Sequence, residues 1–132
     1  MDKKTIEVSA AVIVIDRKVF AVQRGYGEYK DWWEFPGGKV EAGESPQEAL
    51  VREIKEEHDT LIAIDSLIGT VEYDYPAFHL VMHCFLCEVK EGKLDLLEAE
   101  SSAFLDRSSL YSLRWLPADR LILDRVEKLL CE

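Results

Sequence analysis

Residues 37–60, GGKVEAGESPQEALVREIKEEHDT, constrain the fold of this chain more than any other stretch. Ser45 and Glu48 have the spacing of a capping box, in which each side chain bonds the backbone N–H of the other residue. Pro46 would stand at the first helical position, where a missing N–H is tolerated. The stretch therefore predicts a helix that begins at about Pro46, shortly after a pair of glycines.

This helix would carry a dense set of acids. At about 100° per residue, Glu53, Glu56 and Glu57 fall on one face, beside an apolar face that includes Leu50 and Ile54. Carboxylates three and four residues apart repel one another by about 0.2–0.5 kcal/mol per pair. A divalent cation reverses that sign, because hard cations bind oxygen and bridge carboxylates to phosphates. A solvated acidic face is the simpler alternative, but the nearby glycines, which let backbone approach a ligand closely, favour a metal platform.

The same stretch resembles the Nudix box, G-x5-E-x7-R-E-U-x-E-E-x-G-U, in which U is a bulky apolar residue. The matching positions are Gly38, Glu44, Arg52, Glu53, Ile54, Glu56 and Glu57. Asp59 stands where the box has its last glycine, and Thr60 where it has its last apolar residue. Because Asp tolerates the left-handed backbone that ends many helices, Asp59 is expected to end this one.

Composition limits the class of protein. The chain has 132 residues, 48% of them hydrophobic, which suits one domain spanning residues 1–132. It has neither an apolar run of bilayer length nor a signal-peptide core, so we expect no membrane contact and a cytoplasmic location. A net charge of −10 argues against a duplex nucleic acid partner, but it agrees with a nucleotide whose phosphates are neutralised by bound cations.

The cysteines, Cys84, Cys87 and Cys131, form an odd set without secretory context, so we expect reduced thiols. Cys84 and Cys87 could form half of a zinc site. On a strand, however, their side chains would point to opposite faces, and the sequence has no second pair. Buried apolar cysteines are the favoured interpretation.

Strand patterns lie on both sides of the helix. Residues 5–24 predict two strands joined by a tight turn at 16–18, and the apolar run at 10–15 predicts a central strand that is covered on both faces. Residues 61–73 and 78–89 predict a long antiparallel hairpin. Residues 10–15 are therefore expected at the centre of the sheet.

Two helical signals follow the hairpin. Asp106 could cap a short turn through Leu110, and Pro117 could start a final amphipathic helix. We expect that helix to pack on the sheet opposite the helix of residues 46–58. The fold class is then α/β, and the resemblance implies a Nudix-type α/β/α sandwich with a mixed central sheet.

The segment WEFPGGK, residues 33–39, is also similar to the MutT-like branch of the family, and the overall motif pattern resembles the CTP pyrophosphohydrolase type. The resemblance implies a Mg²⁺ cofactor, with Mn²⁺ able to substitute. The implied metal ligands are the Gly37 carbonyl, Glu53, Glu56, Glu57 and Glu98. Glu100 is the nearby alternative to Glu98.

The catalytic set implied by the resemblance is Glu53, Glu44 and Arg52. Glu53 would act as general base or would bind the cation that activates water, because crowded carboxylates raise one another's pKa. Arg52 is expected to orient a glutamate such as Glu44 or Glu53 rather than to touch substrate.

The resemblance also implies substrate contacts. They come from Arg24, Glu34, Gly38, Lys39, Tyr75 and Phe78. Arg24 would touch phosphate, and Tyr75 or Phe78 would stack on the base, with simple hairpin packing as the alternative for the two rings. In the branch member specific for oxidised guanine, an amide and an acid read the base edge, and Leu113 and Arg114 stand at those positions here.

The implied reaction is Mg-dependent hydrolysis of a nucleoside triphosphate, CTP or dCTP first, to the monophosphate and pyrophosphate. One alternative is an 8-oxo-dGTP sanitising pyrophosphohydrolase. A different class is a non-catalytic nucleotide-binding Nudix module, against which the complete Glu53, Glu56 and Glu57 set argues. The protein is expected to be a monomer or a homodimer.

Overall fold

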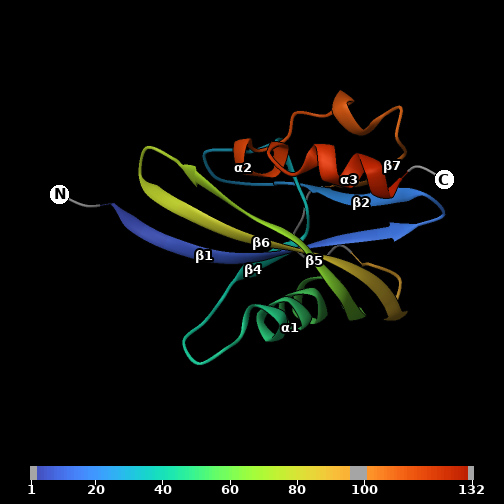
Figure 1. The fold of residues 1–132 in the computed structure, drawn as a ribbon, viewed down its shortest axis with the longest axis horizontal. Coiled ribbons are helices and arrows are strands. Elements are labelled where there is room, and N and C mark those ends of the chain that lie inside the picture. Colours follow the sequence, from blue (N-terminus) through green and yellow to red (C-terminus); the bar gives the residue numbers. More distant parts are fainter. Residues whose placement is uncertain (1–2, 96–100, 131–132) are drawn as a thin grey trace.

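The computed structural model describes residues 3–95 and 101–130 of the chain. Helix α1 lies on one side of a twisted sheet and helices α2 and α3 lie on the other, which gives the predicted α/β/α layers (Figure 1). The strands are β1 (Lys4–Ile15), β2 (Lys18–Gln23), β3 (Trp33–Glu34), β4 (Gly37–Lys39), β5 (Leu61–Asp74), β6 (Phe78–Glu91) and β7 (Ser101–Leu105). The helices are α1 (Pro46–His58), the 3₁₀ turn η1 (Leu110–Ser112), α2 (Pro117–Arg120) and α3 (Leu123–Leu129).

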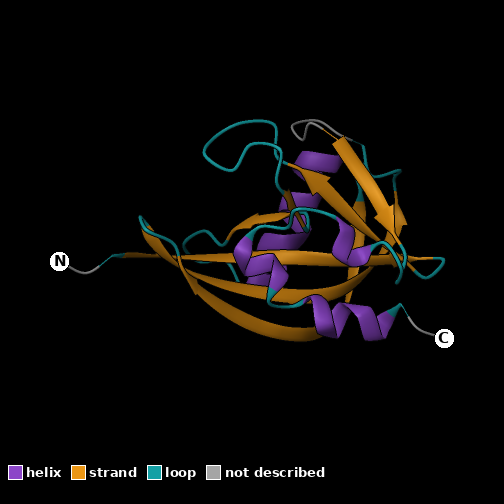
Figure 2. Cartoon of the chain, turned by 90° about the horizontal axis from the view of Figure 1, so that it is seen from above, coloured by secondary structure: helices purple, strands orange, loops and turns teal. Residues whose placement is uncertain are grey.

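The sheet is mixed and centred on β1. Its order is β3-β2-β1-β6-β5, with β4 pairing to β1 and β7 pairing to β2. Strands β1 and β6 are parallel, whereas β5 and β6 form the predicted antiparallel hairpin. Residues Asp16 and Arg17 join β1 to β2 with φ angles of 52° and 62°, so they form the expected tight turn. Seen from above, the strands run beneath the C-terminal helices (Figure 2).

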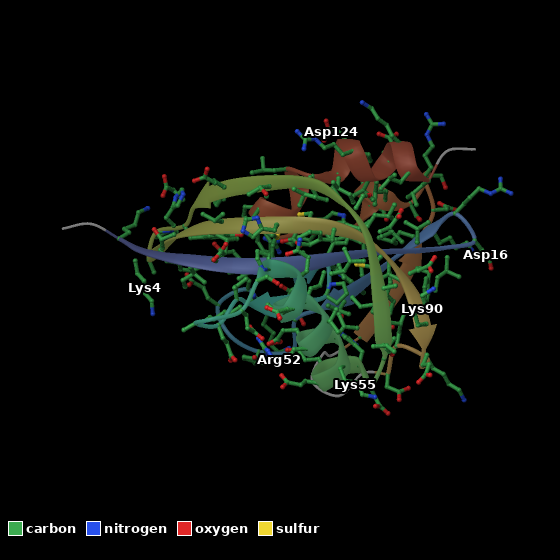
Figure 3. All side chains as sticks on the ribbon, turned by 60° about the horizontal axis from the view of Figure 1, so that its bottom comes forward. Lys4, Asp16, Arg52, Lys55, Lys90 and Asp124 are labelled. Carbon is green, nitrogen blue, oxygen red and sulfur yellow. The ribbon has the colours of Figure 1, made fainter. Side chains whose placement is uncertain are left out.

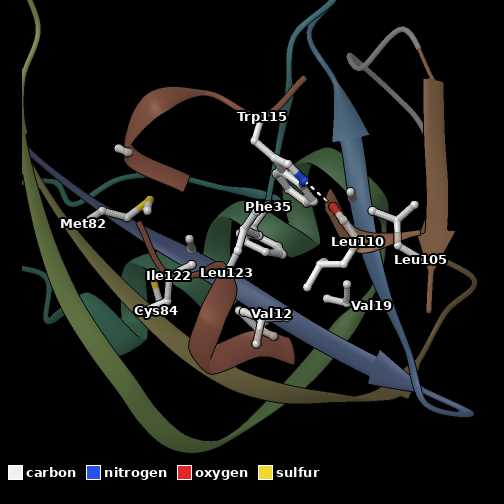
Figure 4. Packing of buried hydrophobic residues seen from close by; sticks show 14 of the residues in the cluster. Val12, Val19, Phe35, Met82, Cys84, Leu105, Leu110, Trp115, Ile122 and Leu123 are labelled. Carbon is white, nitrogen blue, oxygen red and sulfur yellow. Dashed lines mark hydrogen bonds between the residues drawn. The ribbon is translucent and has the colours of Figure 1, made fainter. Parts of the chain in front are cut away.

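Strand β1 is covered on both faces, as its apolar run predicts. Alternate side chains enter different cores, with Ala11 and Ile13 packed toward α1 and Ala10 and Val12 packed toward α3. All four are at most 3% exposed. The core on the α3 side is shown in Figure 4, where the indole Nε1–H of Trp115 donates to the carbonyl of Leu110 at 2.7 Å.

Helix α1 begins where the capping signals predict. The Ser45 hydroxyl accepts from the Glu48 N–H at 3.1 Å, and the Glu48 carboxylate accepts from the Ser45 N–H at 2.8 Å. At the other end Asp59 adopts φ 48° and ψ 43°, the left-handed conformation expected of it. The helix therefore keeps its length although glycine is absent from the cap.

The C-terminal region agrees with the prediction in one place and differs from it in another. Asp106 caps the short turn as predicted, because its carboxylate accepts from the Ser109 N–H at 3.0 Å, and the 3₁₀ turn η1 at Leu110–Ser112 follows. The helix from Pro117, however, is split into α2 and α3. Between them the N–H groups of Leu121 and Ile122 bond the carbonyls three residues back, at 3.1 and 3.2 Å, rather than four back as in an α-helix.

Cys84 and Cys87 are buried free thiols that belong to the cores on opposite sides of the sheet, as expected. Burial raises the pKa of each thiol to about 12, so both are protonated and inert. Cys131 lies outside the described residues. Within residues 3–95 and 101–130, no helix has the length and apolar character needed to cross a membrane.

Candidate active site

A cavity of about 620 Å³ runs along β1 and joins two chemically different ends. Its acidic end is formed by Gly37, Gly38, Glu53 and Glu57, and its aromatic end by Tyr29, Tyr75 and Phe78. In the sheet, Phe78 pairs with Lys4 and Gly37 pairs with Ala10. The six steps from Lys4 to Ala10 along β1 correspond to about 20 Å at 3.3 Å per residue. The cavity is long enough for an extended ligand with two different ends.

The two glycines of β4 are required by close packing. A Cβ on Gly37 would collide with the backbone of Ser9 and Ala10, and a Cβ on Gly38 would collide with the carboxylate of Glu53. The Glu53 carboxylate therefore packs in the space that a side chain at position 38 would fill. The β4 backbone thus lies directly against the Glu53 side chain of α1.

Arg52 organises the carboxylates behind this end of the cavity. Its guanidinium binds Glu44 at 2.6 and 2.9 Å, and Nη1 reaches Glu53 at 3.2 Å and Glu56 at 3.1 Å. Nη2 also donates to the carbonyl of Lys39 at 3.1 Å. The two-point bond from Arg52 lowers the pKa of Glu44 to about 2. Arg52 therefore donates hydrogen bonds to carboxylates and to the backbone, and it lies on the α1 side of the molecule (Figure 3).

The acidic end has the donor chemistry of a hard divalent cation. Glu53 and Glu57 are one helical turn apart, and both line the cavity. The room that Gly38 leaves beside Glu53 keeps side-chain carbon away from its carboxylate. Carboxylate and backbone oxygens are the ligands that Mg²⁺ takes, so the residues fit this ion.

The implied ligand set is only partly gathered. In residues 3–95 and 101–130, no three His, Cys, Asp or Glu side chains converge closely enough to hold a metal ion by themselves. Glu56 pairs with Arg52, its side chain is 60% exposed, and it is not part of the cavity lining. Glu98 and its alternative Glu100 lie outside the described residues.

Asp119, on α2, is a cavity residue that the sequence interpretation missed. Only 4% of it is exposed, and its carboxylate accepts from the Phe35 N–H at 2.9 Å. Burial, together with the nearby charge of Glu34, raises the pKa of Asp119 to about 8. At neutral pH this carboxyl therefore carries a proton and both donates and accepts hydrogen bonds. An acid in the first turn of a helix ordinarily interacts with the helix dipole, so the position of Asp119 in the sequence does not indicate that it lines a cavity.

Arg24 and Glu34 form a pair beside Asp119. Arg24 Nε lies 3.0 Å from Glu34 Oε2, and Nη2 lies 3.3 Å from Oε1. Burial opposes the charge of Arg24, but the Glu34 carboxylate outweighs it and the pKa of Arg24 is raised. Burial also raises the pKa of Glu34, against the pull of Arg24. Arg24 thus neutralises an acid of the cavity wall.

The aromatic end is a cluster of rings around Tyr75. Phe78 stacks on Tyr75 at a centroid distance of 5.0 Å, and Tyr29 and Tyr73 meet it edge-on at 5.6 and 4.7 Å. The Tyr75 hydroxyl accepts from the Ala118 N–H at 3.2 Å, which joins the hairpin to α2. Tyr75 is 4% exposed, and burial raises its pKa to about 12. Tyr75 and Phe78 therefore both pack the β5–β6 hairpin and form part of the cavity wall.

The structure gathers most of the residues that the sequence singles out. In the cavity lining are Arg24, Glu34, Gly37, Gly38, Lys39, Glu53, Glu57, Tyr75 and Phe78. Glu44 and Arg52 stand behind it, in the ion-pair network of α1. Leu113 and Arg114 are not in the lining, and Arg114 instead lies over the Trp32 ring at 4.3 Å. The lining instead includes the buried acid Asp119.

The carboxylates of α1 lie against the glycines of β4, at one end of a cavity that continues to buried aromatic and acidic groups. This arrangement suits a hydrolase of phosphate compounds. The family model described as "NUDIX domain" matches residues 5–129. The chain belongs to the Nudix family of hydrolases, and it is similar to proteins named as diphosphatases and pyrophosphohydrolases and to MutT structures.

Similar proteins carry two different substrate names. The 8-oxo-dGTP diphosphatase of Proteus vulgaris is 39% identical over 104 residues, which cover 77% of this chain and 91% of that protein. The CTP pyrophosphohydrolase of Escherichia coli K12 is 43% identical over 77 residues, which cover 58% of this chain and 51% of that protein.

Solved structures show the same fold. The ORF135 protein of E. coli has a TM-score of 0.83 at 29% identity, covering 96% of this chain and 91% of that chain. A MutT Nudix hydrolase from Burkholderia pseudomallei has a TM-score of 0.86 at 25% identity, covering 94% of this chain and 99% of that chain. The predicted sandwich with a mixed sheet is confirmed.

Proposed function

We propose that this protein hydrolyses a nucleoside triphosphate to the monophosphate and pyrophosphate, with Mg²⁺ as cofactor. The observation that carries the proposal is the single cavity that joins the carboxylates of α1 to the rings and the buried acid at the far end. Phosphates, which need cations, would lie at the acidic end. The base, which needs stacking and a hydrogen-bonding partner, would lie at the aromatic end.

The reaction would take place at Glu53. When bound, a divalent cation neutralises the phosphates and lowers the pKa of a bound water. The Glu53 carboxylate is held by Arg52 at 3.2 Å and seated on Gly38, so it keeps one orientation toward the cavity. From there it binds the activating cation or accepts the proton of the attacking water. Glu57, one turn along α1, supplies a second carboxylate.

Asp119 would read the base. A protonated carboxyl pairs best with an edge that offers an N–H donor beside an acceptor. Cytosine offers its N4 amino group beside N3, whereas the N7 and O6 edge of unmodified guanine offers acceptors alone, and guanine matches a protonated carboxyl only through N1–H and O6. A cytosine nucleotide, CTP or dCTP, therefore fits the chemistry of the buried acid. The 43% identity to a CTP pyrophosphohydrolase supports this candidate.

8-oxo-dGTP is a second candidate, and a separate observation favours it. Oxidation at C8 places a hydrogen on N7, so that this edge also offers a donor beside the O6 acceptor. Relatives named 8-oxo-dGTP diphosphatase include one that is 30% identical over 128 residues, 96% of this chain. The cavity wall is therefore compatible with both bases.

Pyrophosphate release from a nucleotide panel tests the proposal. CTP, dCTP, 8-oxo-dGTP and dGTP would each be incubated with Mg²⁺, and pyrophosphate and orthophosphate would be measured separately. We expect pyrophosphate from a cytosine nucleotide or from 8-oxo-dGTP, at a kcat/KM at least about 10-fold above dGTP, as one well-matched pair of bonds provides. Orthophosphate as the only phosphate product would contradict the proposal.

Metal removal separates catalysis from binding. EDTA should abolish pyrophosphate release, and Mg²⁺ or Mn²⁺ should restore it, because the carboxylates alone offer no positive charge to the phosphates. A protein that binds nucleotide with Mg²⁺ but releases no product would instead be a non-catalytic binding module. We further propose a cytoplasmic enzyme, active as a monomer or homodimer and without affinity for duplex nucleic acid.

A further inference from the structure

Two acids and one cation line the cavity close to one another. Glu34 on β3 and Asp119 on α2 both belong to the lining, together with Arg24, which directly follows β2. The backbone holds these three elements together. Strand β3 pairs with β2, and the Leu116 N–H, just before α2, donates to the Trp33 carbonyl at 2.8 Å. The fold thus brings together three charged side chains that are up to 95 positions apart in the sequence.

The cation is shared unequally between the two acids. Arg24 binds both carboxylate oxygens of Glu34, at 3.0 and 3.3 Å. Asp119 forms no ion pair with any residue of the ranges 3–95 and 101–130, and its Oδ2 accepts from the Phe35 N–H instead. A buried carboxylate without a counter-ion costs much free energy, so Asp119 is the acid that keeps a proton. Because Oδ2 is occupied as an acceptor, the hydrogen belongs on Oδ1.

Asp119 is surrounded by titratable groups from several elements. Burial is the main cause of its raised pKa; the charge of Glu34 raises that pKa further, and the charge of Arg24 lowers it. The Tyr75 hydroxyl, from the β5–β6 turn, and the Cys84 thiol, from β6, also face it, but each has a pKa of about 12 and is neutral near pH 7. Glu34 and Arg24 therefore supply the charge beside Asp119, with opposite effects.

We propose that Glu34 and Arg24 are positioning residues that act through Asp119 on the choice of base. The Glu34 carboxylate places a negative charge beside Asp119 and holds the cation that would otherwise stabilise an ionised Asp119. Asp119 therefore keeps its proton and presents one donor and one acceptor to the cavity. This inference rests on the proposed function, in which Asp119 reads the base.

The proton on Asp119 decides between two kinds of base edge. A protonated carboxyl matches a donor beside an acceptor, which cytosine and 8-oxoguanine both offer. An ionised carboxylate only accepts, so it matches two neighbouring donors, and guanine has these at N1–H and its N2 amino group. Loss of the proton should therefore shift the preference of the enzyme toward dGTP.

Wild type allows a first test without any variant. The kcat/KM for dGTP and for dCTP or 8-oxo-dGTP, whichever releases more pyrophosphate, would be measured from about pH 6 to 8.5 with Mg²⁺. Groups that act on both nucleotides, such as the carboxylates of α1, cancel in the ratio of the two values. We expect the preference over dGTP to fall by about 10-fold as Asp119 loses its proton, at a pH of about 8. A ratio that does not change with pH would overturn the inference.

Two variants with opposite changes of charge test the pair itself. Glu34→Gln removes the negative charge and frees Arg24 to stabilise an ionised Asp119, so the pH at which the ratio falls should drop by about 1 unit or more. Arg24→Gln removes the cation and leaves two buried acids together, so that pH should rise instead. Glu88→Gln makes the same change of charge as Glu34→Gln on an exposed part of β6, and it should leave that pH where it is. A loss of packing alone would not move the two variants in opposite directions.

A measurement without substrate separates the inference from the proposed function. Protein labelled with ¹³C at the Asp carboxyl carbons would be titrated by NMR, and the Asp119 signal would be identified by its loss in Asp119→Asn. Its midpoint should lie near pH 8 in wild type, lower in Glu34→Gln and higher in Arg24→Gln. Equal midpoints in these three proteins would overturn the inference while the proposed function stands. If the midpoints move as expected but no nucleotide releases pyrophosphate, the proposed function fails and the inference on base choice fails with it.

Discussion

The two ends of the cavity are built in opposite ways. The acidic end comes from one continuous stretch, in which β4 leads through a capped turn into α1. The aromatic end is assembled from the loop after β2, the β5–β6 turn and α2, which are far apart in the sequence. The contrast teaches that the reaction is encoded locally, whereas the choice of substrate depends on the whole fold.

The two ends also treat their acids differently. Glu44, at the acidic end, is held ionised by Arg52, with a pKa of about 2. Asp119, at the other end, is buried and has a pKa of about 8. One region uses carboxylates as fixed charges, and the other uses a carboxyl as a neutral hydrogen-bonding group near pH 7.

The largest expected effect is at the acidic end. Glu53→Gln should lower kcat by about 100-fold or more, because the amide neither accepts a proton nor binds the cation strongly. Steady-state pyrophosphate release would measure it, and circular dichroism would check that the fold is intact. Glu88→Gln, an exposed carboxylate on β6 paired with Lys90, is the matched control. Near-normal turnover in Glu53→Gln would remove this residue from the reaction.

A smaller effect is expected at the aromatic end. Asp119→Ala should lower kcat/KM for the preferred nucleotide by about 10-fold to 100-fold, since a lost buried hydrogen bond costs about 1–3 kcal/mol. Asp119→Asn, which still donates and accepts, should recover most of it. The ratio between preferred nucleotide and dGTP is the readout. An equal loss for every nucleotide would make Asp119 structural and would weaken the contrast between the ends.

The third effect is on stability rather than on activity. The folded protein keeps the Asp119 proton up to pH 8, whereas the unfolded chain releases it near the ordinary pKa of about 3.9. The folded state therefore binds more protons between these values, and this group makes the free energy of unfolding fall as pH rises from about 4 to 8. Asp119→Asn should flatten that fall. Urea unfolding of wild type and Asp119→Asn at pH 5.5 and 8.5 would measure the free energy of unfolding of each protein. The same change in that free energy between the two pH values in both proteins would contradict the raised pKa of Asp119.

Much of the acidic end could be predicted because its signals are local. The capping box fixes the start of α1, and the 3.6-residue period places Glu53 and Glu57 on one face. The left-handed cap at Asp59 follows from a single residue type. The ion pairs of Arg52 follow in part from helix spacing, since Glu56 is four residues away.

The remainder depends on contacts that no local pattern carries. Asp119 becomes a cavity residue only because Phe35, 84 positions away, binds its carboxylate and because the last helix breaks after α2. Arg24 lies in the cavity lining, where its phosphate contact stays a prediction, but its ion pair with Glu34 on β3 depends on the pairing of β2 with β3. Thr60 is a minor departure from the box and His58 an unconstrained position of it, until the fold brings Leu94 and Asp95 against them.

The pairing of β1 has a consequence for how substrates are told apart. Gly37 is fixed opposite Ala10 and Phe78 opposite Lys4, so the hydrogen-bond register of one strand sets the spacing between the two ends. A shift of one residue between β1 and β6 would move the ring cluster by about 3.3 Å and turn its side chains to the other face. The register of β1 thus fixes the distance between the acidic and the aromatic end of the cavity, and with it the length of a ligand that can reach both.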